Sequence, residues 1–158
     1  MSHSQPSRYD TVVIPALLRH ARTAYGAAMR KALAGIDCDD IPKHGMYVIG
    51  GLAMGAGGVP LGQLVKELGV SKQVAGQLVD TLVLRGYLDR STDAEDRRKL
   101  TIALTPRGQA AAAAQAIARE RIDAELMAQV GERCVGQMRK ALGALCAMGR
   151  AEGEESDH

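Results

Sequence analysis

Two short helical patterns, joined by a turn that contains glycine, constrain this chain more than any other feature. The first pattern places apolar residues at the i, i+3, i+4 and i+7 positions of one helix face, Leu61, Leu64, Val65 and Leu68. Gly69 is placed to end this helix, and the hydroxyl of Ser71 can cap the next one. The second pattern has a wider apolar stripe, formed by Val74, Ala75, Leu78, Val79, Leu82 and Val83. Gly86 is placed to end the second helix.

This arrangement predicts a helix-turn-helix, in which the second helix enters the major groove of DNA and its first residues face the base edges. The candidate DNA-binding residues on that face are Ser71, Lys72, Gln73, Gly76 and Gln77. By itself, a helix-turn-helix pattern is a weak signal of function.

A charged hairpin is predicted directly after the second helix. Residues 87–91 and 99–104 can pair as strands, and the inward side chains of the second strand are Leu100, Ile102 and Leu104. The loop 92–98 is longer than the roughly two to five residues that a hairpin turn needs. Its acidic residues, Asp93, Glu95 and Asp96, would hold basic side chains toward phosphate or a narrow minor groove. The candidate contacts are Arg97, Arg98 and Lys99, and the alternative is a solvated charge cluster.

Taken together, the run GVSKQVAGQLVDTLVLRGYLDR, followed by DAEDRR and then LTPRG, resembles the MarR family of bacterial winged helix-turn-helix regulators. The resemblance is close over Val48–Gly108 and looser over the flanking helices. It implies a mainly α fold with a small β-hairpin wing, DNA binding, and dimerisation through the terminal helices. Family wings often carry arginine where this chain has Glu95, so we expect Arg97 and Arg98 to make the wing contacts.

Helical patterns also flank this segment. Residues 10–34 have apolar side chains near helical spacing, with Pro15 in the first turns. Thr105 can cap a helix from Pro106 toward Val130, and Gly131 separates it from a last helix over residues 132–149. These helices present more apolar surface than one winged helix can bury, so we expect a homodimer. The alternative is that the alanine run of residues 110–114 packs within one chain.

The predicted organisation is a helical dimerisation region at residues 1–40 and 105–150, a winged helix-turn-helix at 41–104, and an acidic, disordered tail at 151–158. The tail holds four acidic and no basic residues, so the net charge of +2 for the whole chain becomes +6 for residues 1–150. That positive charge is adequate for a DNA-binding protein. The 46% of hydrophobic residues supply enough material for a core.

Glycine is frequent in the helix that we expect after Asp40, which can cap it, with Pro42 near its start. Three glycines fall inside this helix, Gly45, Gly50 and Gly51. Each lowers helix stability by about 1 kcal/mol relative to alanine. Close approach of another helix is favoured as the reason over a cavity kept open for a ligand. The candidate ligand-binding residues are Tyr25, Met29, His44 and Tyr47. Residues 55–60 are interpreted as a linker.

Metal and thiol chemistry are weaker alternatives. Cys38 lies between Asp37 and Asp39, whose carboxylates disfavour the thiolate that peroxide sensing requires. It also lies away from the first-helix cysteine position of the family's organic-peroxide sensors. A zinc site could be built from Asp37, Cys38, Asp40 and His44, but their spacing is not a recognised one. Cys134 and Cys146 are most simply helix-packing residues.

Catalytic motifs, cysteine content and apolar runs limit which class of protein this chain can belong to and where in the cell it works. No catalytic triad, phosphate loop or paired-carboxylate spacing stands out, so we expect neither an enzyme nor a bound cofactor. Three cysteines fit a reducing compartment. The absence of a signal peptide and of a long apolar run also favours the cytoplasm.

The sequence therefore predicts a homodimeric transcriptional regulator, most simply a repressor released by a small ligand, that binds a pseudo-palindromic DNA duplex. One alternative is a metal- or thiol-responsive regulator of the same fold. The other is a dimeric protein-interaction module that does not bind DNA, for which the affinity for DNA would not depend on salt.

Overall fold

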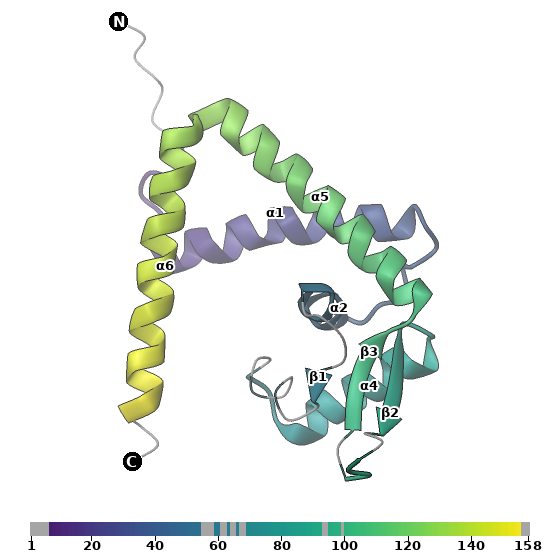
Figure 1. Cartoon of the computed structure of the whole chain (residues 1–158). Coiled ribbons are helices and arrows are strands. Elements are labelled where there is room, and N and C mark those ends of the chain that lie inside the picture. Colours follow the sequence, from purple (N-terminus) through teal and green to yellow (C-terminus); the bar gives the residue numbers. More distant parts are fainter. Residues whose placement is uncertain are drawn as a thin grey trace, which may run out of the picture. The chain divides into compact units, whose positions relative to one another are not determined.

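The computed structural model describes residues 7–54, 59–60, 63, 66, 69–92, 95–98 and 100–155. The elements, in chain order, are α1 (Ile14–Ala34), α2 (Gly45–Met54), β1 (Val59–Pro60), α4 (Lys72–Leu84), β2 (Leu88–Thr92), β3 (Leu100–Leu104), α5 (Pro106–Val130) and α6 (Glu132–Glu155) (Figure 1). This mainly α architecture with a small sheet confirms the predicted fold class.

The chain forms two compact units, Met1–Arg119 and Glu120–His158, with the boundary inside α5. A shared core holds the first unit together, in which Leu33 of α1 and Ala111 of α5 are buried in one cluster with Ile49 of α2. The C-terminal half of α1 and the first half of α5 therefore fold together with the winged helix-turn-helix.

Helix α2 is the central element of the first unit. Its buried residues are Gly45, Met46, Val48, Ile49 and Leu52. A helix with so many buried apolar side chains must be covered on several sides. Other members of the same buried cluster come from α4 and from the base of the hairpin, Val79, Leu82, Tyr87, Leu88 and Ile102.

The predicted close approach explains one of the three α2 glycines. A Cβ at Gly45 would lie 2.8 Å from Ile41 Cγ2 and 3.1 Å from Leu82 Cδ2, so α4 packs directly on this position. At Gly50 the nearest atom would be Gln115 Oε1 at 3.6 Å, an ordinary contact. Among the described residues, nothing lies within 4 Å of a Cβ at Gly51, so their packing gives no reason for glycine there.

The sheet contains the predicted hairpin and one strand more. Its order is β1-β3-β2, with both pairs antiparallel, and Leu88 lies opposite Leu104. Val59 pairs with Ile102, so the prediction of a plain linker over residues 55–60 was wrong for Val59–Pro60. Ile102 is buried and Leu104 packs against the core, which agrees with the predicted inward alternation.

Local signals marked several helix ends correctly. The Ser71 Oγ accepts a hydrogen bond of 3.2 Å from the Val74 N–H, which caps α4 as predicted. Gly86 and Gly131 follow the ends of α4 and α5 with φ of 82° and 84°, in the left-handed region that glycine favours. The Thr105 hydroxyl accepts a 3.0 Å hydrogen bond from the Gly108 N–H at the start of α5.

Three other local expectations were wrong. Asp40 does not cap α2, which begins at Gly45, because its carboxylate is bonded to a distant tyrosine described below. Val74 is exposed rather than part of the core stripe of α4. The acidic tail was expected to be disordered from residue 151, but α6 continues to Glu155. The long α6 helix extends through glutamates because they are compatible with helical backbone.

Several predictions lie outside the described residues. They concern the first helix of the helix-turn-helix, with Leu61, Leu64, Val65 and Leu68, and the loop residues Asp93 and Lys99.

The second unit contains the end of α5 and all of α6. Arg139 of α6 lies 3.8 Å from Asp123 of α5, and both side chains are well exposed. Cys134 and Cys146, which were expected to pack between helices, are exposed in the single chain. Met138, Leu145 and Met148 are also exposed, so α6 presents apolar side chains that the single chain leaves uncovered.

Candidate nucleic-acid interface

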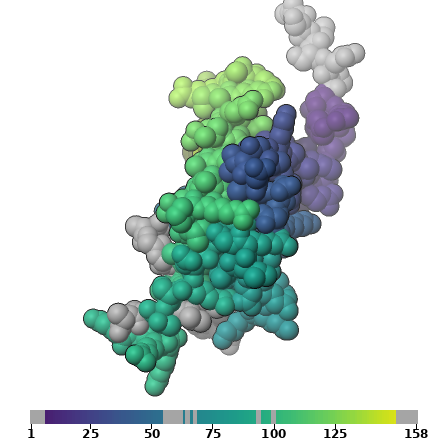
Figure 2. Space-filling view, turned by 90° about the vertical axis from the view of Figure 1, so that its right-hand side faces the viewer, coloured from purple at the N-terminus to yellow at the C-terminus, as the bar shows by residue number. Residues whose placement is uncertain are grey.

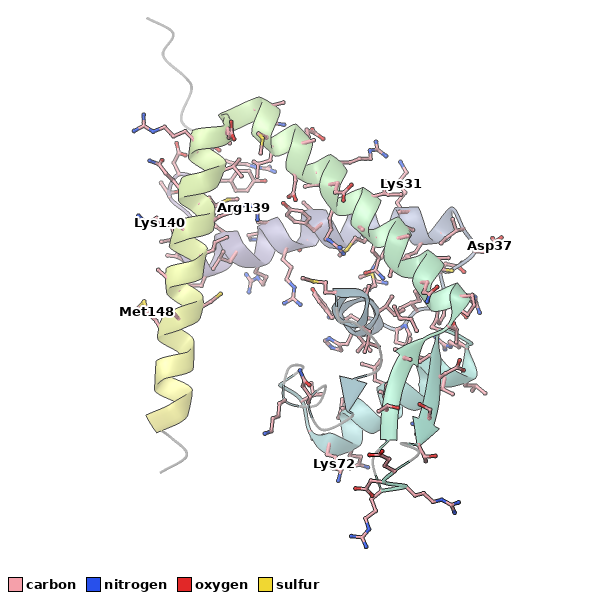
Figure 3. The ribbon with its side chains drawn as sticks, in the orientation of Figure 1. Lys31, Asp37, Lys72, Arg139, Lys140 and Met148 are labelled. Atoms are coloured by element: carbon pink, nitrogen blue, oxygen red, sulfur yellow. The ribbon has the colours of Figure 1, made fainter. Side chains whose placement is uncertain are left out.

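The start of α4 presents polar side chains to solvent. Lys72 and Gln73 are exposed, directly after the Ser71 cap. The opposite side of the helix is anchored in the core by Ala75, Val79 and Leu82, which are fully buried. Figure 3 shows Lys72 at the same end of the first unit as the hairpin loop. Two polar elements from different parts of the sequence are thus presented on one end of the unit.

The hairpin is a projecting wing (Figure 2). Arg97 and Arg98 are exposed in its loop. The Asp96 carboxylate accepts a hydrogen bond of 3.1 Å from the Arg98 backbone N–H. This acidic residue therefore orders the backbone of the turn.

A pair that sequence reasoning missed connects the wing to α4. Arg90 of β2 donates a hydrogen bond to the Asp80 carboxylate of α4, and the two form an ion pair. On the far side of the hairpin, the hydroxyls of Ser91 and Thr101 lie 2.6 Å apart. No periodic pattern links residues 80 and 90, so only the packing of β2 beside α4 reveals this contact.

A joint built around the buried Tyr87 connects α4, the wing and α5. Tyr87 is fully buried, and its hydroxyl donates a hydrogen bond to the Asp40 carboxylate. The Arg107 guanidinium lies over the Tyr87 ring, 4.3 Å from its centroid. Arg107 also donates a 2.5 Å hydrogen bond to the Arg85 carbonyl and a 3.2 Å bond to the Asp37 carbonyl. We call the residues Asp40, Tyr87, Arg107 and Gly108 the α4–α5 joint.

Contacts within the joint also shift the pKa values of Asp40 and Tyr87. The hydrogen bond from Tyr87 lowers the pKa of Asp40, and the Arg107 charge lowers it further. Burial raises the pKa of Tyr87 far above its usual range, and the hydrogen bond to Asp40 raises it further. The carboxylate is thus favoured as an anion and the phenol as a neutral donor, which is the combination that their hydrogen bond requires.

Glycine makes the close packing of the joint possible. A Cβ at Gly108 would lie 2.1 Å from the Tyr87 carbonyl oxygen, inside any allowed contact distance. Thr105 completes the turn between β3 and α5, because its hydroxyl donates a 2.5 Å hydrogen bond to the Gly86 carbonyl. The end of α4 and the start of α5 are therefore held against each other.

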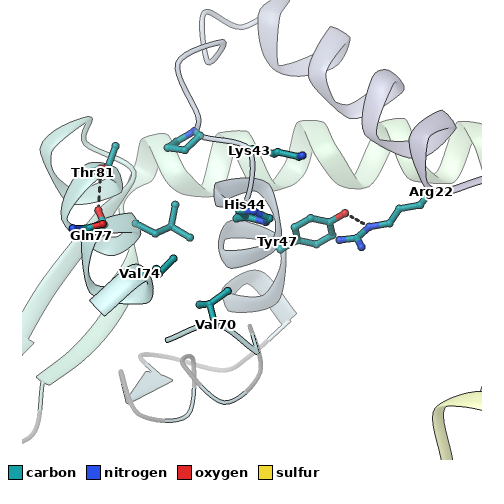
Figure 4. A pocket seen from close by; sticks show the side chains of 10 residues that line it. Arg22, Lys43, His44, Tyr47, Val70, Val74, Gln77 and Thr81 are labelled. Carbon is teal, nitrogen blue, oxygen red and sulfur yellow. Dashed lines mark hydrogen bonds between the residues drawn. The ribbon is translucent and has the colours of Figure 1, made fainter. Parts of the chain in front are cut away.

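A cavity of ≈610 Å³ opens between α2 and α4 (Figure 4). Its lining residues are Arg22, Pro42, Lys43, His44, Tyr47, Val70, Val74, Gln77, Leu78 and Thr81. Arg22 donates a hydrogen bond to the Tyr47 hydroxyl, and its guanidinium lies 4.3 Å from the centroid of that ring. Gln77, one of the candidate DNA-binding residues, is therefore also a wall residue of this cavity.

The four candidate ligand-binding residues separate into two groups. His44 and Tyr47 line the cavity, whereas Met29 is buried in the core and Tyr25 packs against it. The reason is helical geometry, since positions 25, 29 and 33 of α1 lie on the stripe that faces the core. Arg22, Lys43 and Thr81 were not predicted for this site, although a search for polar residues on the other face of α1 would have found Arg22.

The structure brings Cys38 and Asp40 of the conceivable zinc site to Tyr87 and Arg107, whereas His44 lies elsewhere. The Asp40 carboxylate is engaged by Tyr87 and Arg107, while His44 lines the α2–α4 cavity. Cys38 is buried and its thiol lies 3.6 Å from the Ile36 carbonyl. Among the described residues, no three His, Cys, Asp or Glu side chains are grouped to hold a metal ion. In the same part of the chain, no helix is both long and apolar enough to cross a membrane.

The fold and the two exposed polar elements define a winged helix-turn-helix protein. Residues 44–99 match the sequence model of the MarR family. No curated protein matches the chain in sequence. The crystal structure of MarR is similar to the chain with a TM-score of 0.74 and 19% identity, over 96% of this chain and 99% of that one.

Two further similar structures contain DNA. Streptococcus pneumoniae FabT in complex with DNA has a TM-score of 0.74 and 21% identity, covering 87% of this chain and 94% of that one. The S. aureus MepR–DNA complex has a TM-score of 0.70 and 20% identity, covering 86% and 98%. The family match thus covers residues 44–99, and the similar structures extend the winged helix-turn-helix fold over most of the chain.

Proposed function

We propose that this protein is a homodimeric transcriptional regulator that binds double-stranded DNA with α4 and the wing. The observation that carries the proposal is the placement of the α4 start, with Lys72 and Gln73, at the same end of the first unit as the wing loop (Figure 3). The DNA complexes of FabT and MepR, which share the fold, support it.

The two elements have different chemistry and would do different work. Gln73 has an amide that can bond an adenine edge in the major groove, a contact worth about 1 to 3 kcal/mol of base discrimination. Arg97 and Arg98 suit phosphates or a narrow minor groove, where they add affinity and read DNA shape. Lys72 is suited to phosphate, as is Lys99, which lies outside the described residues.

The proposal of a homodimer is supported by exposed apolar side chains on the terminal helices. Ile14 and Leu18 of α1 are 62% and 41% exposed in the single chain. Met148 of α6 is 64% exposed. Large apolar side chains in such positions favour pairing with a second copy. A dimer would place two α4 helices on a pseudo-palindromic duplex, with half-sites about one helical turn apart.

A small ligand would act through the α2–α4 cavity. The volume of ≈610 Å³ is in the range of small-molecule sites. Val74 and Gln77 of α4 form part of the wall, so an occupant would contact the helix that reads DNA. We therefore propose a repressor whose DNA affinity falls when this cavity is filled. Acting on DNA, the protein would work in the cytoplasm.

The test is a binding titration with a duplex selected from a random pool and with a scrambled duplex, across a series of salt concentrations. We expect a negative slope of log K against log salt for both duplexes, and tighter binding to the selected one. Gln73→Ala should lower the preference for the selected duplex. Gln77→Ala is compared with it in the same titrations, because Gln77 is a candidate DNA-binding residue that also lines the α2–α4 cavity. Affinity that does not change with salt would instead favour the protein-interaction module.

Assembly is tested separately by sedimentation at micromolar protein concentration. We expect a dimer that binds one duplex. A monomer under these conditions would contradict the homodimer.

A further inference from the structure

Helix α4 carries an acidic side chain on the face that is proposed to read DNA. Gln73, Gln77 and Asp80 occupy positions i, i+4 and i+7, so they lie along one face of the helix, and all three are exposed. Phosphates would repel a carboxylate on a face that approaches DNA, unless a cation neutralises it. The wing supplies that cation, because Arg90 of β2 forms an ion pair with Asp80.

The ion pair lies just beyond the point where the wing is anchored in the core. Leu88, at the start of β2, is buried, and β2 packs against α4. Arg90 is paired in the sheet with Ile102 of β3, which is also buried. Residues 89–92 of β2 are exposed. Apolar packing therefore fixes the base of the wing, and the ion pair with Asp80 extends this attachment to the middle of β2.

The two strands of the wing are tied together next to the ion pair. The hydroxyls of Ser91 and Thr101 lie 2.6 Å apart, and the Thr101 hydroxyl donates a 3.2 Å hydrogen bond to the Ser91 carbonyl. These contacts hold β2 and β3 as one ribbon. An interaction that fixes Arg90 therefore also fixes the direction in which the loop with Arg97 and Arg98 projects.

The same ion pair is poorly placed to stabilise the fold. The side chains of Arg90 and Asp80 are 36% and 61% exposed, so water and salt weaken their attraction. Exposed pairs of this kind change the free energy of unfolding little. The main consequence of the pair is therefore the position of the wing relative to α4.

We propose that Arg90 and Asp80 are positioning residues, which clamp the wing to α4 at the spacing that lets both elements contact one duplex. The effect on DNA binding rests on the proposed function, whereas the clamp itself is a property of the first unit. A wing released from α4 would still carry Arg97 and Arg98. Binding would then have to order the whole wing, and this entropy cost would lower the affinity.

The test is a double-mutant cycle of Arg90→Gln and Asp80→Asn, measured as the affinity for the selected duplex at one salt concentration. We expect Arg90→Gln to weaken binding about tenfold in the wild type, but less than about twofold in the Asp80→Asn background. Arg90→Lys should stay within about threefold of the wild type, because an ammonium can also make the contact to the Asp80 carboxylate.

Asp89→Asn is the matched control for the acidic partner. It removes an exposed carboxylate beside Arg90 and leaves the ion pair with Asp80 intact. Removing a negative charge near DNA should raise the affinity slightly. This change should add to that of Arg90→Gln without coupling.

Hydrogen exchange of the DNA-free protein tests the clamp without reference to DNA. The backbone amides of residues 91–92 and 100–101 should exchange several-fold faster in Arg90→Gln, and equally so in Asp80→Asn, because either variant releases the wing. Exchange in Arg90→Lys and Asp89→Asn should match the wild type.

Two results would overturn the clamp. One is unchanged exchange of the wing amides in Arg90→Gln, whether or not the protein binds DNA. The other is an equal loss of affinity from Arg90→Gln in both backgrounds, with a salt slope reduced by about one, which would make Arg90 a direct phosphate contact. A wild type that binds no DNA, but whose wing exchanges faster in both single variants, refutes the proposed function and leaves the clamp standing.

Discussion

The α4–α5 joint and the loop of the wing lie close in sequence, since Tyr87 precedes β2 and Arg107 follows β3, yet they are held in opposite ways. In the joint, Tyr87 is fully buried and is contacted by Asp40, Arg107 and the start of α5. In the wing loop, Arg97 and Arg98 are exposed, and the Arg98 N–H donates a hydrogen bond to the Asp96 carboxylate.

The difference shows how one motif can be both rigid and adaptable. The joint fixes the end of α4 against α5, so the direction of the proposed reading helix is set by buried contacts. The arginine side chains of the loop are exposed, which lets them adjust to a DNA backbone. Changes in the joint should therefore alter the free energy of unfolding, and changes in the loop should alter binding.

The largest effect is expected for Gly108→Ala. The added Cβ would lie 2.1 Å from the Tyr87 carbonyl oxygen, and neither backbone can move away without disturbing the joint. We expect the free energy of unfolding to fall by about 3 kcal/mol or more, measured by urea denaturation. Gly51→Ala in α2 is the control, because no atom of the described residues lies within 4 Å of its Cβ. It should stabilise the helix by up to about 1 kcal/mol. Equal stability of the two variants would mean that the joint is loosely packed.

A smaller effect is expected for Tyr87→Phe, which keeps the buried ring and removes the hydrogen bond to Asp40. The free energy of unfolding should fall by about 1 kcal/mol at neutral pH.

The same variant has a signature in its pH dependence. The pKa of Asp40 in the folded protein lies below its usual 3.8, mainly because of the Tyr87 hydrogen bond. Because folding lowers the pKa of Asp40, the ionised carboxylate stabilises the fold above about pH 3.8. This stabilisation is lost as the pH falls through the pKa that Asp40 has in the folded protein. The difference between wild type and Tyr87→Phe should therefore shrink below about pH 4. A difference that stays constant down to acid pH would contradict the link between Tyr87 and Asp40.

The smallest effect on stability is expected for Arg97→Ala, since its side chain is exposed in the wing. The free energy of unfolding should change by less than about 0.5 kcal/mol. DNA binding should weaken for selected and scrambled duplexes alike, and the slope of log K against log salt should fall by about one for each phosphate that the variant no longer neutralises. Lys31→Ala, which removes an exposed cation of α1 outside the wing, is the control. Unchanged affinity and salt slope would show that the wing is only a solvated charge cluster.

The sequence by itself determined the elements whose signals are local. Ser71, Gly86, Thr105 and Gly131 mark helix ends correctly because capping bonds and left-handed turns involve residues within a few positions of each other. Apolar periodicity likewise predicted α4 and the hairpin, because a helix or strand must present one face to a core. The order of the sequence motifs also gave the resemblance to the MarR family.

Only the tertiary structure decided contacts between distant parts of the chain. Asp40 looks like a helix cap in sequence, but it bonds Tyr87, 47 positions away. The pairing of Val59 with Ile102 and the ion pair of Arg90 with Asp80 also depend on how elements pack.

The candidate ligand residues show the same limit. On α1, the side chains of Tyr25 and Met29 turn to the core, while Arg22 turns to the α2–α4 cavity with His44 and Tyr47 of another segment. The identities of these residues are fixed by the sequence, but a cavity forms only where two or more elements leave space between them. Its charge is then the sum of side chains that no local pattern brings together.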